Sequence, residues 1–298
     1  MSTIISVLLF FLQISLFSSD FDCIVVGTSP FSLFEALYQS HSGKKVLILE
    51  ESDSCGGAWK WINVCGVMHV DLGCHMMGRD LGLKAFLEEY AGCKTVSMDD
   101  PLSPFEETNS PNGWYFSRGC YEFIDHLLQL VAATDIVLLT EHKVDTVTFN
   151  RAEKNALIET NKKKFTTDKL IITPMSAFHL TSTSSPRSQS RYFHLYLLIQ
   201  DASTPKFSYK GGGAVGIARM MNLTHFVDLA HTGRQLIVIQ TYSESLLADP
   251  EIFLAALKTH HWVDASAYIL KAEPYIYETG NFHQGSIAQI GAQGVIEV

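Results

Sequence analysis

The chain has 298 residues, of which 47% are hydrophobic and 18% are charged, so it can bury a sizeable core and does not have the composition of a disordered protein. Its formal net charge of −9 argues against a nucleic-acid partner. A chain of this length is expected to form one large domain or two interleaved domains.

The first 20 residues differ in character from the rest. Thr3–Phe17 is an apolar run of the kind found in signal peptides and membrane anchors, but it is too short to predict a membrane span. No Lys or Arg precedes it, and Ser18-Ser19 makes a poor cleavage site, so a packing helix remains an alternative. A signal segment would place the chain in the secretory pathway or on a membrane, and the cytoplasm is expected otherwise.

The stretch Phe21–Trp61 predicts a strand, a turn, a helix and a second strand. Asp22–Val26 and Lys45–Leu49 are short apolar runs typical of parallel strands that are buried on both faces. Between them lie a turn of small residues and an apolar helical face. Glu50 follows the second strand at its carboxyl end.

This layout is typical of a dinucleotide-binding unit. The N-terminus of a helix offers N–H groups to a pyrophosphate, and an acid about 20 residues after the turn hydrogen-bonds the ribose hydroxyls. The fingerprint has glycine at three turn positions, which are Gly27, Ser29 and Ser32 in this chain. The two serines leave open a unit that binds nothing, whereas Glu50 and the following Gly56-Gly57 favour binding.

The run VLILEESDSCGGAWKW resembles a segment of the FAD-binding flavoproteins that include amine oxidases, protoporphyrinogen oxidases and UDP-galactopyranose mutases. In that superfamily a strand, a Glu and a Gly-Gly pair lie beside the cofactor. Glu50, Gly56 and Gly57 match these positions, and Trp59 would wall the substrate or the flavin ring, with core packing as the alternative. The resemblance implies FAD that is bound without a covalent link.

A second match concerns a histidine. Val70–His75 resembles the D-L-G-x-H segment that places a His near the flavin in some members of the superfamily. The resemblance makes His75 the catalytic candidate, because a His near the flavin would orient substrate or move a proton. A structural, hydrogen-bonded histidine is the alternative.

Further elements follow along the chain. Strands are expected at Val64–Val70 (or a hairpin there), Trp114–Phe116, Ile136–Leu139, Val144–Phe149, Ala156–Thr160, Lys169–Thr173, Tyr192–Gln200, Arg234–Thr241 and Tyr275–Asn281. Helices are expected at Leu81–Tyr90, Tyr121–Ala132, Pro250–His261 and Gln284–Val298. Ser97–Gly113 predicts an exposed loop, and Ser176–Ser190 predicts a Ser/Thr-rich linker.

The resemblance assigns roles to three of these later residues. A strand near Val144 passes the adenine in the resembling family, although a Val in a strand is more often a core residue. The family closes its flavin domain with a strand, a Gly and a helix whose N-terminus points at the flavin. Gly280 and Ser286 match that ending in outline.

The cysteines and the one glycosylation sequon add less. None of the six cysteines has C-x-x-C spacing, so no metal site is expected, and their even number permits disulfides if the chain is secreted. Asn222-Leu223-Thr224 is a sequon of the kind that arises often by chance.

We therefore expect an α/β chain with two interleaved domains. Residues 21–80, 113–175 and 272–298 would form a Rossmann-like FAD-binding domain, and residues 81–112 and 190–271 would form a substrate domain of β-sheet and helices. The expected function is FAD-dependent oxidation of a small-molecule substrate, an amine or another C–H donor, by hydride transfer to flavin. The alternatives are a non-catalytic escort protein resembling the Rab GDP-dissociation inhibitors and a flavin-dependent isomerase.

Overall fold

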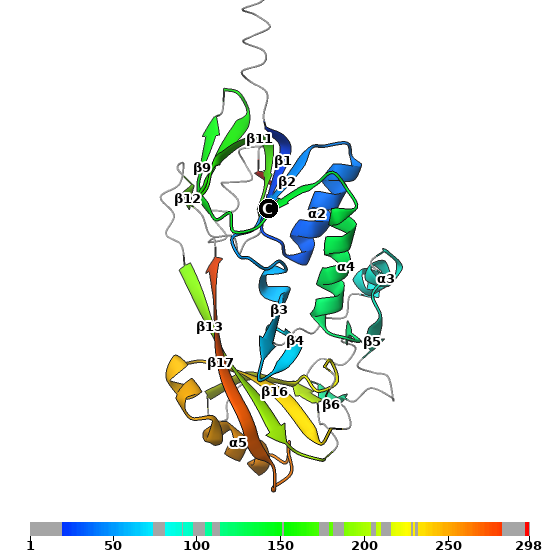
Figure 1. Ribbon diagram of the computed structural model, residues 1–298, viewed down its shortest axis with the longest axis vertical. Helices are drawn as coiled ribbons and strands as arrows, with labels where there is room; N and C mark the ends of the chain where they lie inside the picture. Colours follow the sequence, from blue (N-terminus) through cyan, green and yellow to red (C-terminus); the bar gives the residue numbers. More distant parts are fainter. Residues whose placement is uncertain are drawn as a thin grey trace, which may run out of the picture. The chain divides into compact units, whose positions relative to one another are not determined.

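The structure is a computed structural model that describes residues 20–73, 81–90, 92–97, 105–108, 114–150, 152–172, 179–180, 188–203, 207–209, 216–227, 229, 232–281 and 296–297. The chain divides into two compact units (Figure 1). Unit 1 comprises Met1–Cys55, Val131–Ser188 and Gly280–Val298, and unit 2 comprises Gly56–Leu130 and Gln189–Thr279. The predicted division was also interleaved, but it grouped residues 56–80, 113–130 and 272–279 with the first strand.

Unit 1 is built on one sheet with the strand order β12-β9-β10-β11-β1-β2-β8, and β18 also pairs with β11. Its strands are β1 (Phe21–Val26), β2 (Val46–Leu49), β8 (Val137–Leu139), β9 (Val144–Asn150), β10 (Asn155–Thr160), β11 (Lys164–Ile171), β12 (His179–Leu180) and β18 (Ile296–Glu297). β1 pairs in parallel with β2 on one side and with β11 on the other. β9, β10 and β11 form an antiparallel meander.

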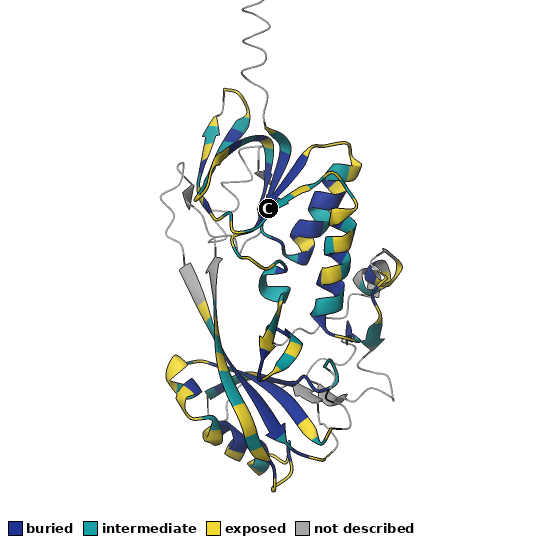
Figure 2. Cartoon of the chain, viewed as in Figure 1, coloured by how far each residue is buried: buried dark blue, intermediate teal, exposed yellow. Residues whose placement is uncertain are grey.

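The helix α2 (Pro30–His41) connects β1 to β2. It buries Leu33, Ala36 and Leu37, which recur at helical spacing. β2 is buried along its whole length, as the unbroken apolar run predicts for a parallel strand covered on both faces. Figure 2 shows these strands and the inner side of α2 as buried.

Unit 2 contains a four-stranded sheet with the order β15-β16-β13-β17. Its strands are β13 (Ser188–Gln200), β15 (Ile217–Asn222), β16 (Arg234–Thr241) and β17 (Tyr268–Asn281), the last of which extends by its final two residues into unit 1. Three two-stranded ladders accompany it: β3 (Trp61–Val64) with β4 (Val67–Asp71), β5 (Thr95–Ser97) with β7 (Trp114–Phe116), and β6 (Phe105–Thr108) with β14 (Phe207–Tyr209). The other helices in the described residues are α3 (Leu81–Tyr90), α4 (Cys120–Ala132) and α5 (Pro250–Thr259), with short 3₁₀ turns η1 (Gly57–Trp59) and η3 (Glu244–Ala248).

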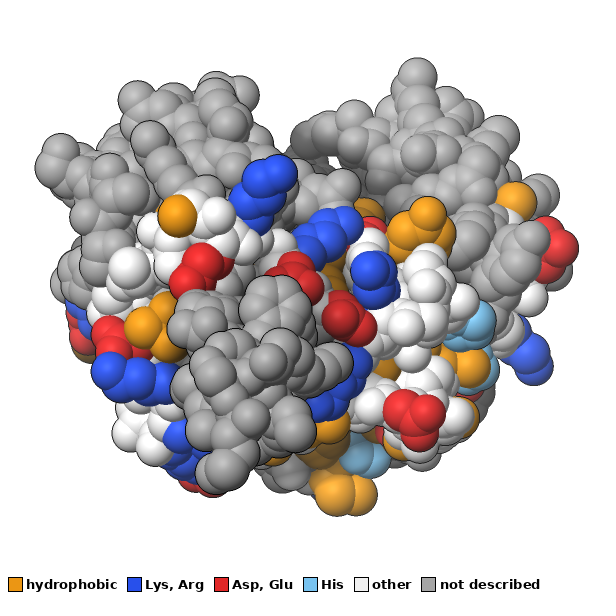
Figure 3. All heavy atoms as spheres, turned by 90° about the horizontal axis from the view of Figure 1, so that it is seen from above, with side chains coloured by type: hydrophobic (Ala, Val, Ile, Leu, Met, Phe, Trp, Pro, Cys, Tyr) orange, Lys and Arg blue, Asp and Glu red, His pale blue; other side chains and the backbone are white. Residues whose placement is uncertain are grey.

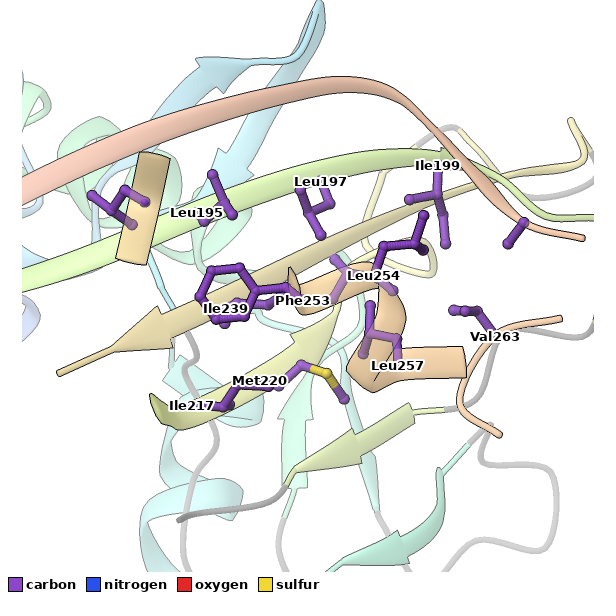
Figure 4. Close-up of a cluster of buried hydrophobic side chains, with 13 residues drawn as sticks. Leu195, Leu197, Ile199, Ile217, Met220, Ile239, Phe253, Leu254, Leu257 and Val263 are labelled. Carbon is purple, nitrogen blue, oxygen red and sulfur yellow. The ribbon is translucent and has the colours of Figure 1, made fainter. Parts of the chain in front are cut away.

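Alternate residues of β13 supply two separate cores in unit 2. Leu195 and Leu197 point to the face that α5 covers, where they join Phe253 (Figure 4). Tyr196 and Leu198 belong to the cluster on the other face, together with residues of the β3–β4 hairpin. This period of two is the pattern of a strand buried on both faces.

Four expectations about the elements need correction. The predicted exposed loop Ser97–Gly113 contains the strand β6, which pairs in parallel with β14. The predicted linker Ser176–Ser190 contains β12 and the start of β13. The strand expected from Lys169 already begins at Lys164. The helix expected over Gln284–Val298 is wrong at its end, where β18 pairs with β11; its other residues lie outside the described part of the chain.

These errors share one physical cause. Each misread strand is short or polar, so its local sequence resembles a turn or a loop. β6, β12 and β18 pair with strands that are distant in sequence, whereas the start of β11 pairs with the preceding strand β10. The other expected helices and strands are confirmed, with ends that differ by one or a few residues, and Val64–Val70 is one arm and the turn of a hairpin. Tyr268 begins β17, which makes that strand longer than expected.

Three further findings concern only the described residues. None of their helices is long and apolar enough to cross a membrane. No group of His, Cys, Asp or Glu side chains among them has the arrangement of a metal site. Cys55, Cys65 and Cys120 are free thiols.

Candidate functional site

A tight turn follows β1. Gly27 has a φ of +90°, in the region that glycine adopts without steric cost. Its N–H donates to the carbonyl of Leu49 at 2.8 Å, which ties the turn to the end of β2. A Cβ placed on Gly27 would meet nothing within 4 Å, so the backbone conformation rather than crowding selects glycine there.

The two serines of the turn act on the start of α2. Ser29 is the N-cap residue, and its Oγ accepts the N–H of Ser32 at 3.3 Å. The hydroxyl oxygens of Ser29 and Ser32 lie 2.9 Å apart in a second hydrogen bond. Pro30 is the first helical residue and has no N–H. The helix N-terminus is therefore capped in part by its own side chains, and the N–H of Phe31 and one serine hydroxyl proton are among its donors toward an anion.

Glu50 is held at the end of β2 by two hydrogen bonds to its carboxylate. Its Oε2 accepts the hydroxyl of Thr28 at 2.5 Å, and its Oε1 accepts the N–H of Ser52 at 2.9 Å. Thr28 is completely buried and Glu50 is 5% exposed. An ionised carboxylate can accept about four hydrogen bonds, so Glu50 keeps acceptor capacity for a further donor.

The backbone of Glu50 is fixed as well. Its N–H donates to the carbonyl of Leu139 at the end of β8, and its carbonyl accepts the N–H of His142 at 2.8 Å. These contacts join the ends of β2 and β8 in the same way that Gly27 joins β1 to β2. The acid is thus held by three neighbouring chain segments.

Thr28 is a site residue that the sequence analysis missed. The available signal was a hydroxyl side chain directly after Gly27, because parallel strands that start a βαβ unit bring their carboxyl ends together. A side chain just past β1 can therefore reach an acid just past β2. Thr28 and Glu50 are 22 positions apart in the sequence, so no local pattern indicates that their side chains are in contact.

Cys55 shares this environment. Burial raises the pKa of its thiol, and the negative charge of Glu50 raises it further, while a hydrogen bond with Thr28 lowers it. Because the pKa of Cys55 is raised overall, its side chain is a neutral thiol at pH 7. Its chemistry is therefore that of a packing group, not of a reactive thiolate.

The predicted residues Gly56, Gly57 and Trp59 belong to unit 2. Gly56 has a φ of +113°, and a Cβ there would lie 2.9 Å from the Cα of Lys60, so only glycine fits. Gly57 begins η1, which ends at Trp59. The Trp59 ring meets the ring of Phe123 edge to face, with centroids 6.3 Å apart.

The remaining predicted residues are placed as follows. Val144 begins β9, is 4% exposed and belongs to the hydrophobic core of unit 1. Gly280 is the last residue but one of β17. His75 and Ser286 lie outside the described residues.

A buried acid in unit 2 was also missed. Asp71 ends β4, and its carboxylate accepts the N–H of Cys120, the first residue of α4, at 2.8 and 3.0 Å. Burial raises the pKa of Asp71 to about 7, although hydrogen bonds from Cys120 and Tyr121 lower it. The Tyr196 hydroxyl donates to the Asp71 carbonyl at 3.0 Å and accepts the N–H of Gly73 at 3.0 Å. These bonds fix the chain just before the D-L-G-x-H histidine.

The unit 1 residues meet at one edge of its sheet. β1 lies between β2 and β11; the chain leaves β1 through α2 to β2 on one side, and it leaves β11 for β12 on the other side. In open α/β sheets, ligands bind outside the carboxyl ends of the strands at such a switch point. Gly27, Ser29, Ser32 and Glu50 all lie there, and the structure brings these four predicted residues together.

Comparison with known proteins supports the same architecture. Wild-type putrescine oxidase bound to putrescine matches with a TM-score of 0.64 and 13% identity over 93% of this chain and 92% of that one. The chain has the fold of the amine-oxidase-like flavoproteins. An oxidoreductase from Methanosarcina mazei matches at a TM-score of 0.60 and 14% identity, over 85% of this chain and 87% of that one.

A third solved structure matches over a similar share of the chain. The Rab GDI of Plasmodium falciparum matches at a TM-score of 0.57 and 10% identity, over 88% of this chain and 90% of that one. No protein-family model and no curated protein matches the sequence. At these identities the comparisons establish the fold.

Proposed function

We propose that this chain is an FAD-dependent oxidoreductase that takes a hydride from a small-molecule substrate, an amine or another C–H donor. The observation that carries the proposal is the placement of Glu50. Its carboxylate lies at the sheet edge where α/β folds bind dinucleotides, it is held by Thr28 and Ser52, and it retains acceptor capacity for ribose hydroxyls.

The residues of this edge fit the adenosine half of FAD. Glu50 would accept the ribose hydroxyls, and the open space over Gly27 admits a close ligand. The phosphates would meet the N–H of Phe31 and the serine hydroxyl proton in place of the bare backbone that glycines present. When bound, the flavin ring supplies the hydride acceptor, and the protein supplies binding and orientation.

The proposal also assigns roles to the other predicted residues. Gly56, Gly57 and Trp59 would line the ring system, with Gly280 and Ser286 near its phosphate and ribityl groups. Val144 would contribute its backbone near the adenine. His75 would orient the substrate or move a proton.

The role of Glu50 is tested with a charge-removing variant. Glu50→Gln keeps the size and one acceptor oxygen but removes the charge that favours ribose hydroxyls, so the purified variant is expected to hold less than a tenth of the wild-type flavin. Glu51→Gln is the matched control, because Glu51 is the adjacent exposed acid. Full flavin content in Glu50→Gln would show that the acid does not bind the ribose.

A second candidate function rests on the start of α2. Ser29 and Pro30 remove two N–H donors that a pyrophosphate would use, which favours a binding or escort protein on the same fold. That candidate predicts no flavin in the wild-type protein and no recovery of flavin binding in Ser29→Gly. Recovery of binding in Ser29→Gly, with none in the wild type, would show that the serine cap blocks an otherwise intact site.

A further inference from the structure

Asp20, the first described residue, is held in place by several hydrogen bonds. The Asp20 carboxylate accepts the N–H of Thr166 at 2.9 Å, and the Asp20 N–H donates to the Thr166 hydroxyl at 3.0 Å. The Lys45 ammonium donates to the Asp20 carbonyl at 2.7 Å, and the Lys45 N–H donates to the Asp22 carboxylate at 2.7 Å. The start of β1 is therefore fixed to β11 and to the residue that precedes β2.

Two lysines and two phenylalanines gather beside this point. The Lys45 ammonium lies over the Phe21 ring, 4.7 Å from its centroid, and the Lys163 ammonium lies over the Phe165 ring at 4.8 Å. The two rings meet edge to face with centroids 6.2 Å apart. Both lysines are exposed. We call Phe21, Lys45, Lys163 and Phe165 the amino-edge cluster.

The neighbouring lysines are engaged with acids. Lys162 lies 3.5 Å from Glu141, and Lys164 pairs with Glu159. Figure 3 looks onto the end of the molecule at which β1 begins and shows cationic and acidic side chains interspersed there. The two lysines of the amino-edge cluster differ from these pairs because their ammonium groups lie over aromatic rings.

The sequence places an apolar segment very close to this cluster. Thr3–Phe17 is apolar apart from three polar residues, and only Ser18 and Ser19 separate it from Asp20. Three residue steps of extended chain reach at most about 11 Å. The headgroup layer on one side of a bilayer is about 5–8 Å thick. If the apolar segment enters hydrocarbon, the cluster must therefore lie in or against the headgroups.

We propose that Thr3–Phe17 enters a phospholipid bilayer from one side and that the amino-edge cluster rests in its headgroup layer. As a helix, the fifteen residues of the segment would rise about 22 Å, which is enough to reach well into the roughly 30 Å of the hydrocarbon core. Lys45 and Lys163 donate to lipid phosphates, while the buried Phe165 ring stays in the hydrophobic core of unit 1 and the Phe21 ring packs against that core. This attachment is independent of the proposed flavin chemistry.

The test is co-flotation of the full chain with vesicles of phosphatidylcholine and phosphatidylserine. The wild type is expected to float with the vesicles, and Lys45→Gln and Lys163→Gln are each expected to bind about fivefold more weakly. Lys258→Gln is the matched control, since it removes a lysine from α5 in unit 2 and leaves binding unchanged. Equal binding by both cluster variants and the control would overturn the role of the cluster.

Two further measurements test whether the cluster variants are folded and whether the apolar segment is required for binding. Lys163 lies in the exposed turn between β10 and β11, so its variant should keep the wild-type circular dichroism spectrum even if Lys45→Gln does not fold. Deletion of residues 1–17 is expected to abolish flotation. Undiminished flotation of the deletion variant, or an intact mass showing that vesicle-bound protein lacks Thr3–Phe17, would overturn the proposal.

Discussion

The hydroxyl of Thr28 donates to the carboxylate of Glu50 across the ends of two neighbouring parallel strands, with 2.5 Å between the oxygens. Both side chains are buried, so neither can exchange this bond for water at low cost. The contact fixes the orientation of the acid before any ligand arrives. It makes Thr28 a positioning residue for the proposed ribose contact.

Thr28→Val removes the hydroxyl and keeps the shape of the side chain. The variant leaves a buried carboxylate with one donor fewer, so we expect a loss of about 1–3 kcal/mol in the free energy of unfolding and a lower flavin content. Urea unfolding and the flavin-to-protein absorbance ratio measure the two effects. Thr28→Ser restores a hydroxyl and should recover most of both, and a Thr28→Val protein with wild-type stability and flavin content would contradict this role.

Gly56 is required by two separate effects, its positive φ and its approach to Lys60. Gly56→Ala should therefore cost more than the roughly 1–2 kcal/mol of a left-handed backbone alone. Gly66→Ala in the same unit is the control, since Gly66 has a φ of +79° but open space around its Cβ position. Equal unfolding free energies for the two variants would show that the contact with Lys60 relaxes without cost.

Asp71 predicts a particular pH dependence of stability. Burial raises its pKa to about 7 from a usual value near 4, so the folded protein holds this proton more tightly than the unfolded chain does. The contribution of the protonated Asp71 carboxyl to the free energy of unfolding is fully present below about pH 4. It is lost as the pH rises through about 7. Asp71→Asn cannot titrate, so its unfolding free energy should fall less between pH 4 and pH 8 than that of the wild type.

Urea unfolding at a series of pH values measures this difference. Asp125→Asn is a suitable control, because Asp125 is an exposed acid on α4. If Asp71→Asn and the wild type lose stability in parallel over this range, Asp71 titrates near its usual pKa and the burial argument fails.

The sequon at Asn222 should remain unmodified in the folded protein. Asn222 is 2% exposed, its amide nitrogen donates to Gln235 at 2.7 Å, and its amide oxygen accepts the N–H of Thr224. A glycan on that nitrogen would break the bond to Gln235 and could not fit a buried position. We expect protein from a secretory host to keep its mass on treatment with an N-glycosidase.

A positive control is available in the same chain. Lys163→Thr creates a sequon at Asn161, which lies in an exposed turn, and should be glycosylated in the same host. A folded fraction that carries sugar at Asn222 would show that this part of β15 opens far enough to admit a glycan.

The strands of unit 1 that bear the proposed site were predictable because their signal is local. β1 and β2 are unbroken apolar runs, and the turn between β1 and α2 is marked by Gly27 and Ser29. Buried parallel strands need such runs on both faces, so few other structures suit these residues. The position of Glu50 at a strand end follows directly.

The missed features depend on partners that are far away in the sequence. β6 pairs with β14, and its residues Glu106 and Glu107 carry no strand signal of their own. The bond between Thr28 and Glu50 and that between Asp71 and Cys120 likewise require the folded topology. Local pattern specifies the elements, and only the packed chain shows which polar groups meet.

The measurement that tests the central proposal most directly is the visible absorption spectrum of the purified full chain, followed by heat release and identification of the cofactor. The proposed function predicts a flavin spectrum and about one FAD released per chain. A colourless protein that also fails to take up added FAD would contradict it and would leave a binding role on the flavoprotein fold.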